Sequence, residues 1–391
     1  MRARIGIDAT RLVSRRTGIE NFIYHLLLGL PDVIGKMPHV DVLVFVKAAM
    51  AESLSAQISS DRVHLIPLAT SHPVLCEQVG LPLWLLKSRV ALDLLHSPGF
   101  PIAPWTLASD VFVTVHDVVF KSMPETLTAG SRYYWQILFP MMMRRAKMIA
   151  VDSSCTAAEL CHHYPFTADK PLRVVPMGVD ERFFSTGIAE PDRRALCERY
   201  GLPARYFICV GALQPRKNLP FLIDVMAYLR ERHTQFSDVM LVLVGRETRQ
   251  AQGIRARVRE CGLDGAVLYL GYVPDDELPV ILSGAQALLF PSLHEGFGIP
   301  VLEAMASGTP VVAAATGALP EVVGEAGFLL SPTDVAAWVE TLVCLLTEPG
   351  VGRALRQAGL ERARSFTWRS TVLKTVDIYI EMLDTLGHQK C

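Results

Sequence analysis

Two glutamates flank a glycine-rich turn in the second half of the chain. Glu295 and Glu303 stand on either side of the sequence Gly-Phe-Gly-Ile-Pro over residues 296–300. The apolar run at residues 287–290 predicts a buried strand, and a proline suits the first turn of a helix because its missing N–H donor is not needed there. The stretch therefore predicts strand, turn and helix, with both carboxyl groups near the helix N-terminus.

The N-terminus of that helix is suited to a phosphate group. Its unpaired N–H groups and dipole favour anions, and Gly296 and Gly298 have no Cβ atom to keep a ligand off the backbone. A carboxylate beside an anion would repel it, so Glu295 and Glu303 are expected to accept hydrogen bonds from hydroxyl groups that flank it. A nucleotide sugar offers that arrangement, whereas the competing interpretation is a solvated helix face.

A second motif places two cations after another predicted strand. Arg216 and Lys217 follow Gly211 in the sequence Val-Gly-Ala-Leu-Gln-Pro-Arg-Lys-Asn over residues 210–218. The arginine fork and the lysine point charge can both bind a diphosphate and stabilise it as a leaving group. The alternative is a solvated pair at a helix start, where the helix dipole disfavours cations.

These motifs carry a family resemblance. The run E-G-F-G-x-P-x-x-E-A-M-A-x-G-x-P-V-V that begins at Glu295 resembles the signature of family-4 retaining glycosyltransferases, which have the two-domain GT-B fold. The resemblance implies that Glu295 positions the donor sugar, Glu303 the ribose, and Arg216 and Lys217 the diphosphate. Other donor contacts are expected from Gly18, Gly211, Gly296, Phe297, Gly298 and Ile299.

The element around Gly211 is similar to the V-G-x-L-x-P-R-K-N element of the same family. Many members have an arginine directly after the glycine, where this chain has Ala212. The departure puts a third cationic contact in doubt and leaves the Arg216 and Lys217 pair in place.

A histidine ends a predicted strand in the first half. His116 follows the run at residues 110–115 and resembles the family's strand-ending histidine, which faces the transferred sugar. We therefore expect His116 to hydrogen-bond a sugar hydroxyl, in its neutral form since its unperturbed pKa is about 6.5. Asp117 is expected to orient His116 or the acceptor. A lone histidine is otherwise more often structural.

The first loop puts Gly18 at the start of a predicted helix, after Arg15 and Arg16. It is similar to the family's glycine loop between donor phosphate and acceptor, which makes Gly18 a point of close approach to the donor. Arg15 and Arg16 are acceptor-side candidates that would meet an anionic acceptor, or else are solvated. Ser153 follows another strand and is predicted to be a helix N-cap rather than a catalyst.

The composition excludes several classes. A net charge of −1 over 391 residues argues against nucleic acid as a partner. No D-x-D motif stands in a loop after a strand, Asp275 and Asp276 lie in a polar loop expected to be away from the motifs, and eight cysteines without a C-x-x-C pair predict reduced thiols. We therefore expect no metal and no other cofactor.

The chain begins without a signal peptide and has no apolar run near the ~18 residues that span a bilayer, so a cytoplasmic protein is expected. The segment 132–147 combines aromatic residues, methionines and a basic end. Core packing is one interpretation. The other is peripheral contact with the inner face of the cytoplasmic membrane to reach a lipid-linked acceptor.

Strands alternate with helices in both halves, which predicts an α/β protein with mostly parallel sheets. The resemblance implies two doubly wound, Rossmann-like GT-B domains, an acceptor-side domain at 1–185 and a nucleotide-sugar domain at 186–365. The segment 366–391 should form a helix that crosses back to the first domain through one apolar stripe. Its members are Phe366, Trp368, Val372, Val376, Ile380 and Leu383.

The expected reaction is retaining transfer of a hexosyl group from a nucleotide sugar to a hydroxyl of a glycan or lipid-linked oligosaccharide. Similarity to bacterial mannosyl- and rhamnosyltransferases favours GDP-mannose or a related donor, in polysaccharide or lipopolysaccharide synthesis. Two alternatives stay open, a GT-B nucleotide-sugar epimerase and a non-catalytic nucleotide-sugar-binding protein.

Overall fold

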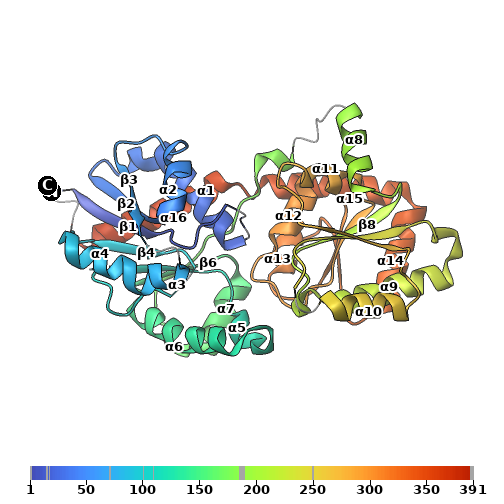
Figure 1. The fold of residues 1–391 in the computed structure, drawn as a ribbon, viewed down its shortest axis with the longest axis horizontal. Helices are drawn as coiled ribbons and strands as arrows, with labels where there is room; N and C mark the ends of the chain where they lie inside the picture. Colours follow the sequence, from blue (N-terminus) through green and yellow to red (C-terminus); the bar gives the residue numbers. More distant parts are fainter. Residues whose placement is uncertain are drawn as a thin grey trace. The chain divides into compact units, whose positions relative to one another are not determined.

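The computed structural model describes residues 2–14, 16, 18–69, 72–99, 101–108, 110–184, 190–248 and 251–387 (Figure 1). The chain divides into two compact units, the first comprising Met1–Gly178 and Trp368–Cys391, the second Val179–Thr367. The sequence places these limits at 185 and 365. The second unit begins at Val179 and ends at Thr367. These two residues form a parallel bridge, so the chain enters and leaves the second unit at neighbouring points.

The first unit is built on a seven-stranded sheet in the order β3-β2-β1-β4-β5-β6-β7. All of its described strand pairs are parallel, and their apolar runs are those expected of strands covered on both faces. The strands are β1 (Ala3–Asp8), β2 (Val40–Lys47), β3 (Val63–Leu68), β4 (Leu94–Ser97), β5 (Asp110–Val115), β6 (Met148–Val151) and β7 (Leu172–Val174).

Helices follow most of these strands, as the alternation predicts. Residues of α4, α6 and α7 form one buried cluster with the sheet, and Ser153 caps α7 by accepting the Thr156 N–H at 3.0 Å, as predicted. The helices are α1 (Gly18–Val33), α2 (Ala48–Ser55), α3 (Pro73–Leu75), α4 (Leu81–Ser88), α5 (Val119–Ser122), α6 (Ala129–Arg145) and α7 (Ser154–His163). Single turns are η1 (Ile34–Lys36), the π-helical η2 (Cys76–Gly80), η3 (Pro124–Thr126) and η4 (Pro165–Thr167).

The second unit contains a six-stranded parallel sheet in the order β10-β9-β8-β11-β12-β13. Its first strand β8 thus lies in the middle, beside β9 and β11. The strands are β8 (Tyr206–Val210), β9 (Met240–Val244), β10 (Val267–Gly271), β11 (Ala287–Phe290), β12 (Val311–Ala314) and β13 (Phe328–Leu330).

Helices of this unit bury one large cluster between α9, α10 and α14 around the fully buried Trp338. Three helices, α8, α13 and α15, are not predicted by the sequence. The many charges of α8 and α15 hide their apolar period, and α13 is only five residues long. The helices are α8 (Glu190–Tyr200), α9 (Leu219–Arg232), α10 (Ala251–Glu260), α11 (Leu278–Gly284), α12 (Ile299–Ala306), α13 (Leu319–Val323), α14 (Val335–Thr347) and α15 (Pro349–Arg364). Single turns are η5 (Glu181–Phe183), η6 (Pro215–Lys217) and η7 (Thr234–Phe236).

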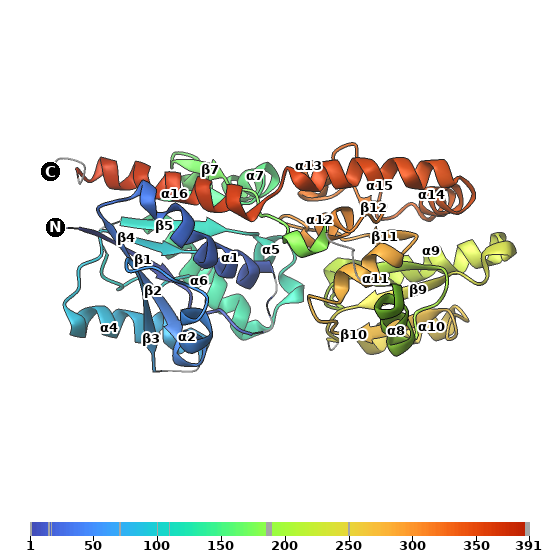
Figure 2. The ribbon, with the colours of Figure 1, turned by 90° about the horizontal axis from the view of Figure 1, so that it is seen from above.

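The last helix, α16 (Trp368–Thr385), belongs to the first unit, which confirms the predicted crossing. It lies along α1 and reaches β4 (Figure 2). The approach to α1 is close, since a Cβ atom on Gly29 would lie 2.8 Å from Val372. The fully buried Tyr379, which the predicted stripe omits, bonds His96 Nδ1 at 2.7 Å, and His96 Nε2 lies 2.9 Å from the Thr114 hydroxyl.

Tyr379→Phe should therefore destabilise the first unit. The change leaves a buried nitrogen of His96 unpaired, which typically costs about 1–3 kcal/mol. Urea unfolding followed by circular dichroism measures the effect. Tyr133→Phe, which removes an exposed hydroxyl from α6 of the same unit, is the control and should leave the midpoint unchanged. Equal urea midpoints for Tyr379→Phe and Tyr133→Phe would show that the Tyr379 hydroxyl does not stabilise the packing of α16.

Candidate functional site

The cations and the first glutamate of the two sequence motifs meet in the second unit. Glu295 Oε1 lies 2.7 Å from Lys217 Nζ and 2.6 Å from Arg216 Nη1. Arg216 and Lys217 follow β8 and Glu295 follows β11, and these strands are parallel neighbours. Their carboxyl ends therefore lie at one edge of the sheet, where open α/β sheets bind ligands. The interpretation of Arg216 and Lys217 as a solvated pair is wrong.

Two members of the cluster are nearly closed to solvent, whereas Arg216 is partly exposed. Lys217 is 5% exposed and Glu295 is 7% exposed. Burial alone would favour the neutral carboxyl group, but Lys217 and Arg216 lower the pKa of Glu295 to about 2. Burial also lowers the pKa of Lys217, against the opposing effect of Glu295. Glu295 is thus a carboxylate at every physiological pH.

Two glycines are needed to hold this arrangement. Gly211 has a φ of +139°, and a Cβ atom there would lie 2.8 Å from Lys217 Cε. Gly317 has a φ of +55°, and a Cβ atom there would lie 2.5 Å from the carbonyl oxygen of Glu295. Lys217 Nζ also lies 4.2 Å from the centre of the Phe290 ring. The backbone at Gly211 and Gly317 thus contacts Lys217 and Glu295 closely. A larger residue at either glycine would displace these charged residues.

The glycine turn after Glu295 leads directly into α12. Gly298 is the N-cap residue with a φ of +108°, and no side chain of the described residues caps this end. Ile299 begins the helix one residue before the predicted start. Phe297 is buried against the edge of the Phe366 ring, at 5.9 Å between centroids. Because Gly298 has no side chain to cap α12, this helix end lacks the usual side-chain acceptor and is suited to bind an anion.

Glu303 lies one turn into α12 and is partly exposed. Among the described residues it has no hydrogen-bond partner. Burial raises its pKa to about 8, and the nearby carboxylates of Asp275 and Asp180 add to the effect. The prediction that Asp275 lies away from the motifs is therefore wrong, because the loop after β10 returns toward α12. No group of three metal-ligating side chains is found in the described chain.

The raised pKa of Glu303 predicts a pH-dependent stability. Its usual pKa of 4.5 applies to the unfolded chain, so between pH 4.5 and about 8 the folded state binds more protons than the unfolded state. Stability therefore falls as pH rises through this window. Glu303→Gln removes the effect, and its melting temperature should exceed that of the wild type by more at pH 9 than at pH 5. A pH-independent difference would contradict the shifted pKa.

His116 lies in the first unit with a partner that the sequence analysis did not assign. Its Nδ1 is 2.7 Å from Asp152 Oδ2, and its Nε2 is 3.3 Å from the carbonyl oxygen of Pro98. Val115 and Val151, the last residues of β5 and β6, are register partners. His116 and Asp152 each follow one of these strands by one residue, so they face each other. Asp152 was identifiable only as the residue before the Ser153 cap.

The orientation of His116 thus comes from Asp152 and not from Asp117, whose Oδ1 accepts the N–H of Val119 at 3.0 Å. The sequence predicts a neutral imidazole. Burial would lower the pKa of His116, but the Asp152 carboxylate raises it above its usual value. Both ring nitrogens face acceptors, a carboxylate and a carbonyl, so both hydrogen bonds form only with the doubly protonated ring.

The glycine loop is described in part. Gly18 begins α1, as predicted. Arg16 donates from Nε to Asn21 Oδ1 at 3.2 Å, and its guanidinium lies 3.7 Å from the centre of the Tyr24 ring. Arg15 lies outside the described residues. Arg16 is thus held on the surface of α1.

Comparisons with known proteins show which family the chain is similar to. Residues 204–348 match the family model described as glycosyl transferases group 1. A D-inositol 3-phosphate glycosyltransferase of Corynebacterium efficiens is 32% identical over 323 residues, which cover 80% of this chain and 71% of that protein. The chain belongs to the group 1 glycosyltransferases. The same edge of β8 and β11 lies within the matched residues.

Two further likenesses concern this glycosyltransferase as a whole. The O-antigen chain mannosyltransferase B of Escherichia coli is 28% identical over 84% of this chain and 86% of that protein. The structure of Anabaena HepE in complex with UDP and glucose matches 97% of this chain and all of that chain, with a TM-score of 0.72 and 16% identity. The two parallel-sheet units and this likeness confirm the GT-B fold.

Proposed function

We propose that this glycosyltransferase moves mannose, or a deoxy-mannose type sugar, from a nucleoside diphosphate to a hydroxyl of a glycan or lipid-linked acceptor. GDP-mannose is the first candidate donor, in the synthesis of a surface polysaccharide such as lipopolysaccharide. The observation that carries the proposal is the Arg216, Lys217 and Glu295 cluster beside the uncapped end of α12. The mannosyltransferase named above supports the choice of sugar.

The cluster has the parts that departure of a diphosphate requires. Lys217 and Arg216 neutralise the negative charge that develops on the leaving diphosphate, and the first N–H groups of α12 bind the same oxygens. Both cations are held beside one oxygen of Glu295, and binding of the diphosphate competes with this pairing. Glu295 then accepts a hydrogen bond from a hydroxyl of the sugar, and Glu303 accepts from the ribose.

The reaction proceeds in this proposal with retention. The acceptor oxygen attacks the anomeric carbon on the face that the diphosphate leaves, the bond to the phosphate oxygen breaks, and that oxygen takes the acceptor proton. No protein nucleophile is then required. His116 donates to a sugar hydroxyl after its Nε2–H leaves the Pro98 carbonyl, and Asp152 holds the ring by the opposite nitrogen.

We also propose that catalysis needs no metal, because Arg216 and Lys217 supply the positive charge that a metal would otherwise supply to the diphosphate. Activity should survive excess EDTA. A loss of activity that Mg²⁺ or Mn²⁺ restores would overturn this mechanism.

Incubation with radiolabelled GDP-mannose and UDP-glucose, with and without a lipid-linked oligosaccharide extract, tests the proposal. The expected result is that the labelled sugar is transferred to the lipid-linked oligosaccharide and that the donor stays unchanged when the extract is omitted. NMR of the product should show an α-linkage, as in the α-linked donor. Lys217→Met is the matched inactive control. Conversion of the donor to an epimeric sugar nucleotide without extract would establish the epimerase instead. Donor binding without any conversion would establish a binding protein.

A further inference from the structure

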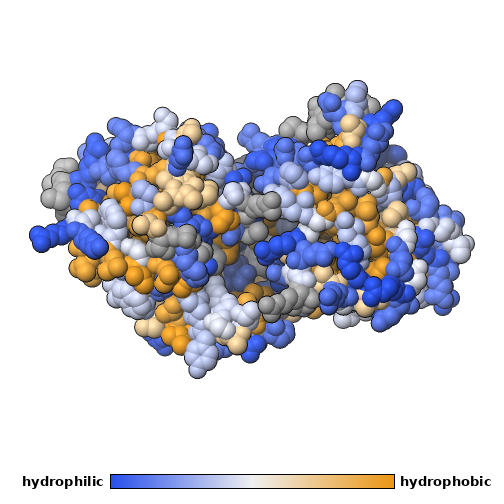
Figure 3. Space-filling model, viewed as in Figure 1, coloured by the Kyte–Doolittle hydropathy of each residue, from blue (hydrophilic) through white to orange (hydrophobic). Residues whose placement is uncertain are grey.

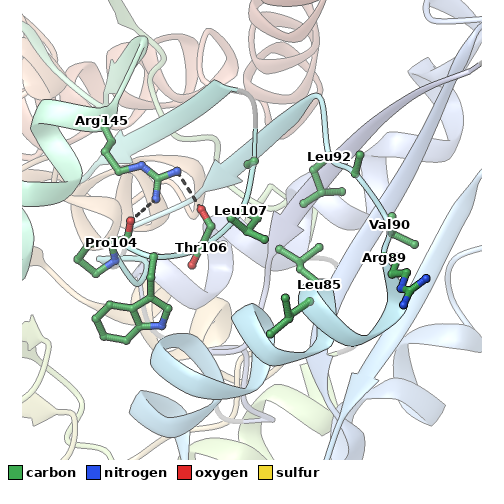
Figure 4. Close-up of a pocket in the computed structure, with 12 residues that line it drawn as sticks. Leu85, Arg89, Val90, Leu92, Pro104, Thr106, Leu107 and Arg145 are labelled. Carbon is green, nitrogen blue, oxygen red and sulfur yellow. Dashed lines mark hydrogen bonds between the residues drawn. The ribbon is translucent and has the colours of Figure 1, made fainter.

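The first unit has a pocket of its own, lined by residues of this unit. Its volume is about 680 Å³, within the range of small-molecule sites. Figure 4 shows it between the end of α4 and the segment 104–108, with Leu85, Leu92 and Leu107 among its lining residues. The wall at 104–108 is fixed by Arg145, which donates to the carbonyl oxygens of Pro104 at 2.8 Å and Thr106 at 2.9 Å.

The pocket lies at the end of the sheet opposite His116. Both of its walls precede strands, since α4 leads into β4 and the segment 104–108 leads into β5. His116 follows the other end of β5, and six residues of strand span about 20 Å. A ligand in the pocket is therefore separate from the sugar chemistry expected at His116.

The surface around the pocket is apolar where most protein surfaces are polar. Six of the thirteen large apolar side chains found exposed in the described chain lie between residues 75 and 107, and three of the six line the pocket. They are Leu75, Val79, Leu83, Leu86, Trp105 and Leu107. Leu86 is 63% exposed and Trp105 is 60% exposed. Figure 3 shows apolar side chains gathered where Figure 1 labels α4.

The exposed positions on the helical segment 73–88 form one stripe. Leu75, Val79, Leu83 and Leu86 recur at steps of four, four and three residues along α3, η2 and α4. Such spacing places them on one side of a helix, while Leu81 and Leu85 are buried in the core of the unit. A helix that buries one apolar face and exposes another has the pattern of a segment lying in a membrane interface.

The exposed Lys, Arg, Asp and Glu residues of the segment 72–108 have one sign. Lys87 and Arg89 are exposed at the end of α4. The acidic residues of the segment 72–108 are Glu77 and Asp93, and neither is an exposed charge. Glu77 is buried in an ion pair with Arg11, and Asp93 accepts the backbone N–H of Arg4 at 2.8 Å. The face therefore complements an anionic surface and not a cationic one.

Two further details describe the pocket and its rim. The hydroxyl of Thr106, which lines the pocket and is 2% exposed, has no hydrogen-bond partner in the described chain. Arg89, at the rim, has a φ of +57°, a conformation that residues other than glycine adopt only at a cost in energy. Glycine is the residue usually found at such a helix end. Arg89 therefore adopts a backbone conformation that is unfavourable for arginine.

We propose that this face of α4 and the segment 104–108 binds an anionic phospholipid bilayer. The stripe enters the interface, one acyl chain occupies the pocket, and Lys87 and Arg89 contact lipid phosphates. Docking is peripheral. No single helix of the described chain has the length and apolarity to cross a bilayer, and the pair α14 and α15, which together reach the required composition, is bent by 100°.

Sedimentation of the full chain with vesicles tests the proposal without donor or acceptor, so its outcome is independent of the transferase activity. Vesicles of phosphatidylglycerol with phosphatidylcholine should bind the protein, and vesicles of phosphatidylcholine alone should not. Binding should weaken as salt rises, because the phosphate contacts are screened. Absence of binding to the anionic vesicles would overturn the proposal.

Two variants test the face itself. Leu86→Ser should weaken binding about tenfold, the value of one buried leucine, whereas Val174→Ser, which alters another exposed aliphatic residue of the first unit, should bind as the wild type. Arg89→Gly should weaken binding about fivefold while keeping or raising the melting temperature. Equal binding by Leu86→Ser and Val174→Ser would show that another surface binds lipid.

Two measurements identify the occupant. Lipids with brominated acyl chains should quench the fluorescence of Trp105, and the quenching should be largely lost in Trp105→Phe. Analytical ultracentrifugation without vesicles tests the rival occupant, a second copy of the chain. A dimer that Leu86→Ser dissociates, together with no vesicle binding, would assign the face to self-association and refute lipid docking.

Discussion

Glu295→Gln is expected to abolish sugar transfer while leaving the binding of nucleoside diphosphate intact or tighter. The carboxylate holds Lys217 Nζ and Arg216 Nη1 on one oxygen. Without its charge both cations are free to bind the diphosphate, while the sugar loses a charged acceptor. We expect a fall in kcat of about 10²-fold or more, the scale of losing one preorganised electrostatic contact. Single-turnover kinetics and calorimetry with GDP and UDP measure the two effects.

Glu303→Gln is the comparison variant, because it makes the same substitution eight positions along the chain at a carboxyl group that its raised pKa keeps protonated at neutral pH. It should raise the dissociation constant of the nucleotide through the ribose and affect the chemical step less. The ionisation of Glu295, with its pKa of about 2, should leave no trace in the rate between pH 5 and 9. Equal losses of nucleotide affinity in both variants would show that these roles are assigned wrongly.

Lys217→Met is expected to have the second large effect, on activity and stability together. Methionine keeps the apolar stem beneath Gly211 and beside Phe290 but removes the ammonium group. The value of kcat/KM should fall about 10²-fold or more. Breaking a buried ion pair by removing one partner costs about 3–5 kcal/mol, and Arg216 should hold the loss to the lower end of that range.

A double-mutant cycle separates these contributions. Lys217→Met with Glu295→Gln should be less destabilised than the sum of the single changes, because the second substitution neutralises the carboxylate that the first leaves under-compensated. Chemical unfolding of all four proteins gives the coupling. Strict additivity would show that Lys217 and Glu295 are not coupled in the folded state. Arg216→Ala is the companion change for activity, and effects below about threefold in both cation variants would remove them from the mechanism.

Much of the local structure follows from the sequence because it depends on neighbours along the chain. The runs Asp110–Val115 and Ala287–Phe290 are strands at the predicted positions, since short apolar runs between turn residues have few alternatives. A proline in the first turn and glycines at positive φ likewise fix the ends of α12. Family motifs add the site residues, and the GT-B fold follows from them.

Tertiary structure decided which of these residues meet. The pairing of β5 with β6 sets Asp152 opposite His116, although Asp117 is adjacent in sequence. A chain of parallel strands can be ordered in several ways, and the order is fixed by how helices cover the sheet rather than by any local pattern. The proximity of Asp275 to Glu303 also results from the order and packing of the elements. The same is true of the hydrogen bond between Tyr379 of α16 and His96.

The apolar face of α4 shows the same division. Its sequence reads as an ordinary core segment, because Leu, Val and Trp have the same period whether a helix buries one face or two. Only the packing of the first unit shows that Leu81 and Leu85 fill the core and that Leu83 and Leu86 remain exposed. The sequence by itself thus determined the elements and the residue types at the site. The fold alone decided partners, charge states and exposed surfaces, because these depend on contacts between residues far apart in the chain.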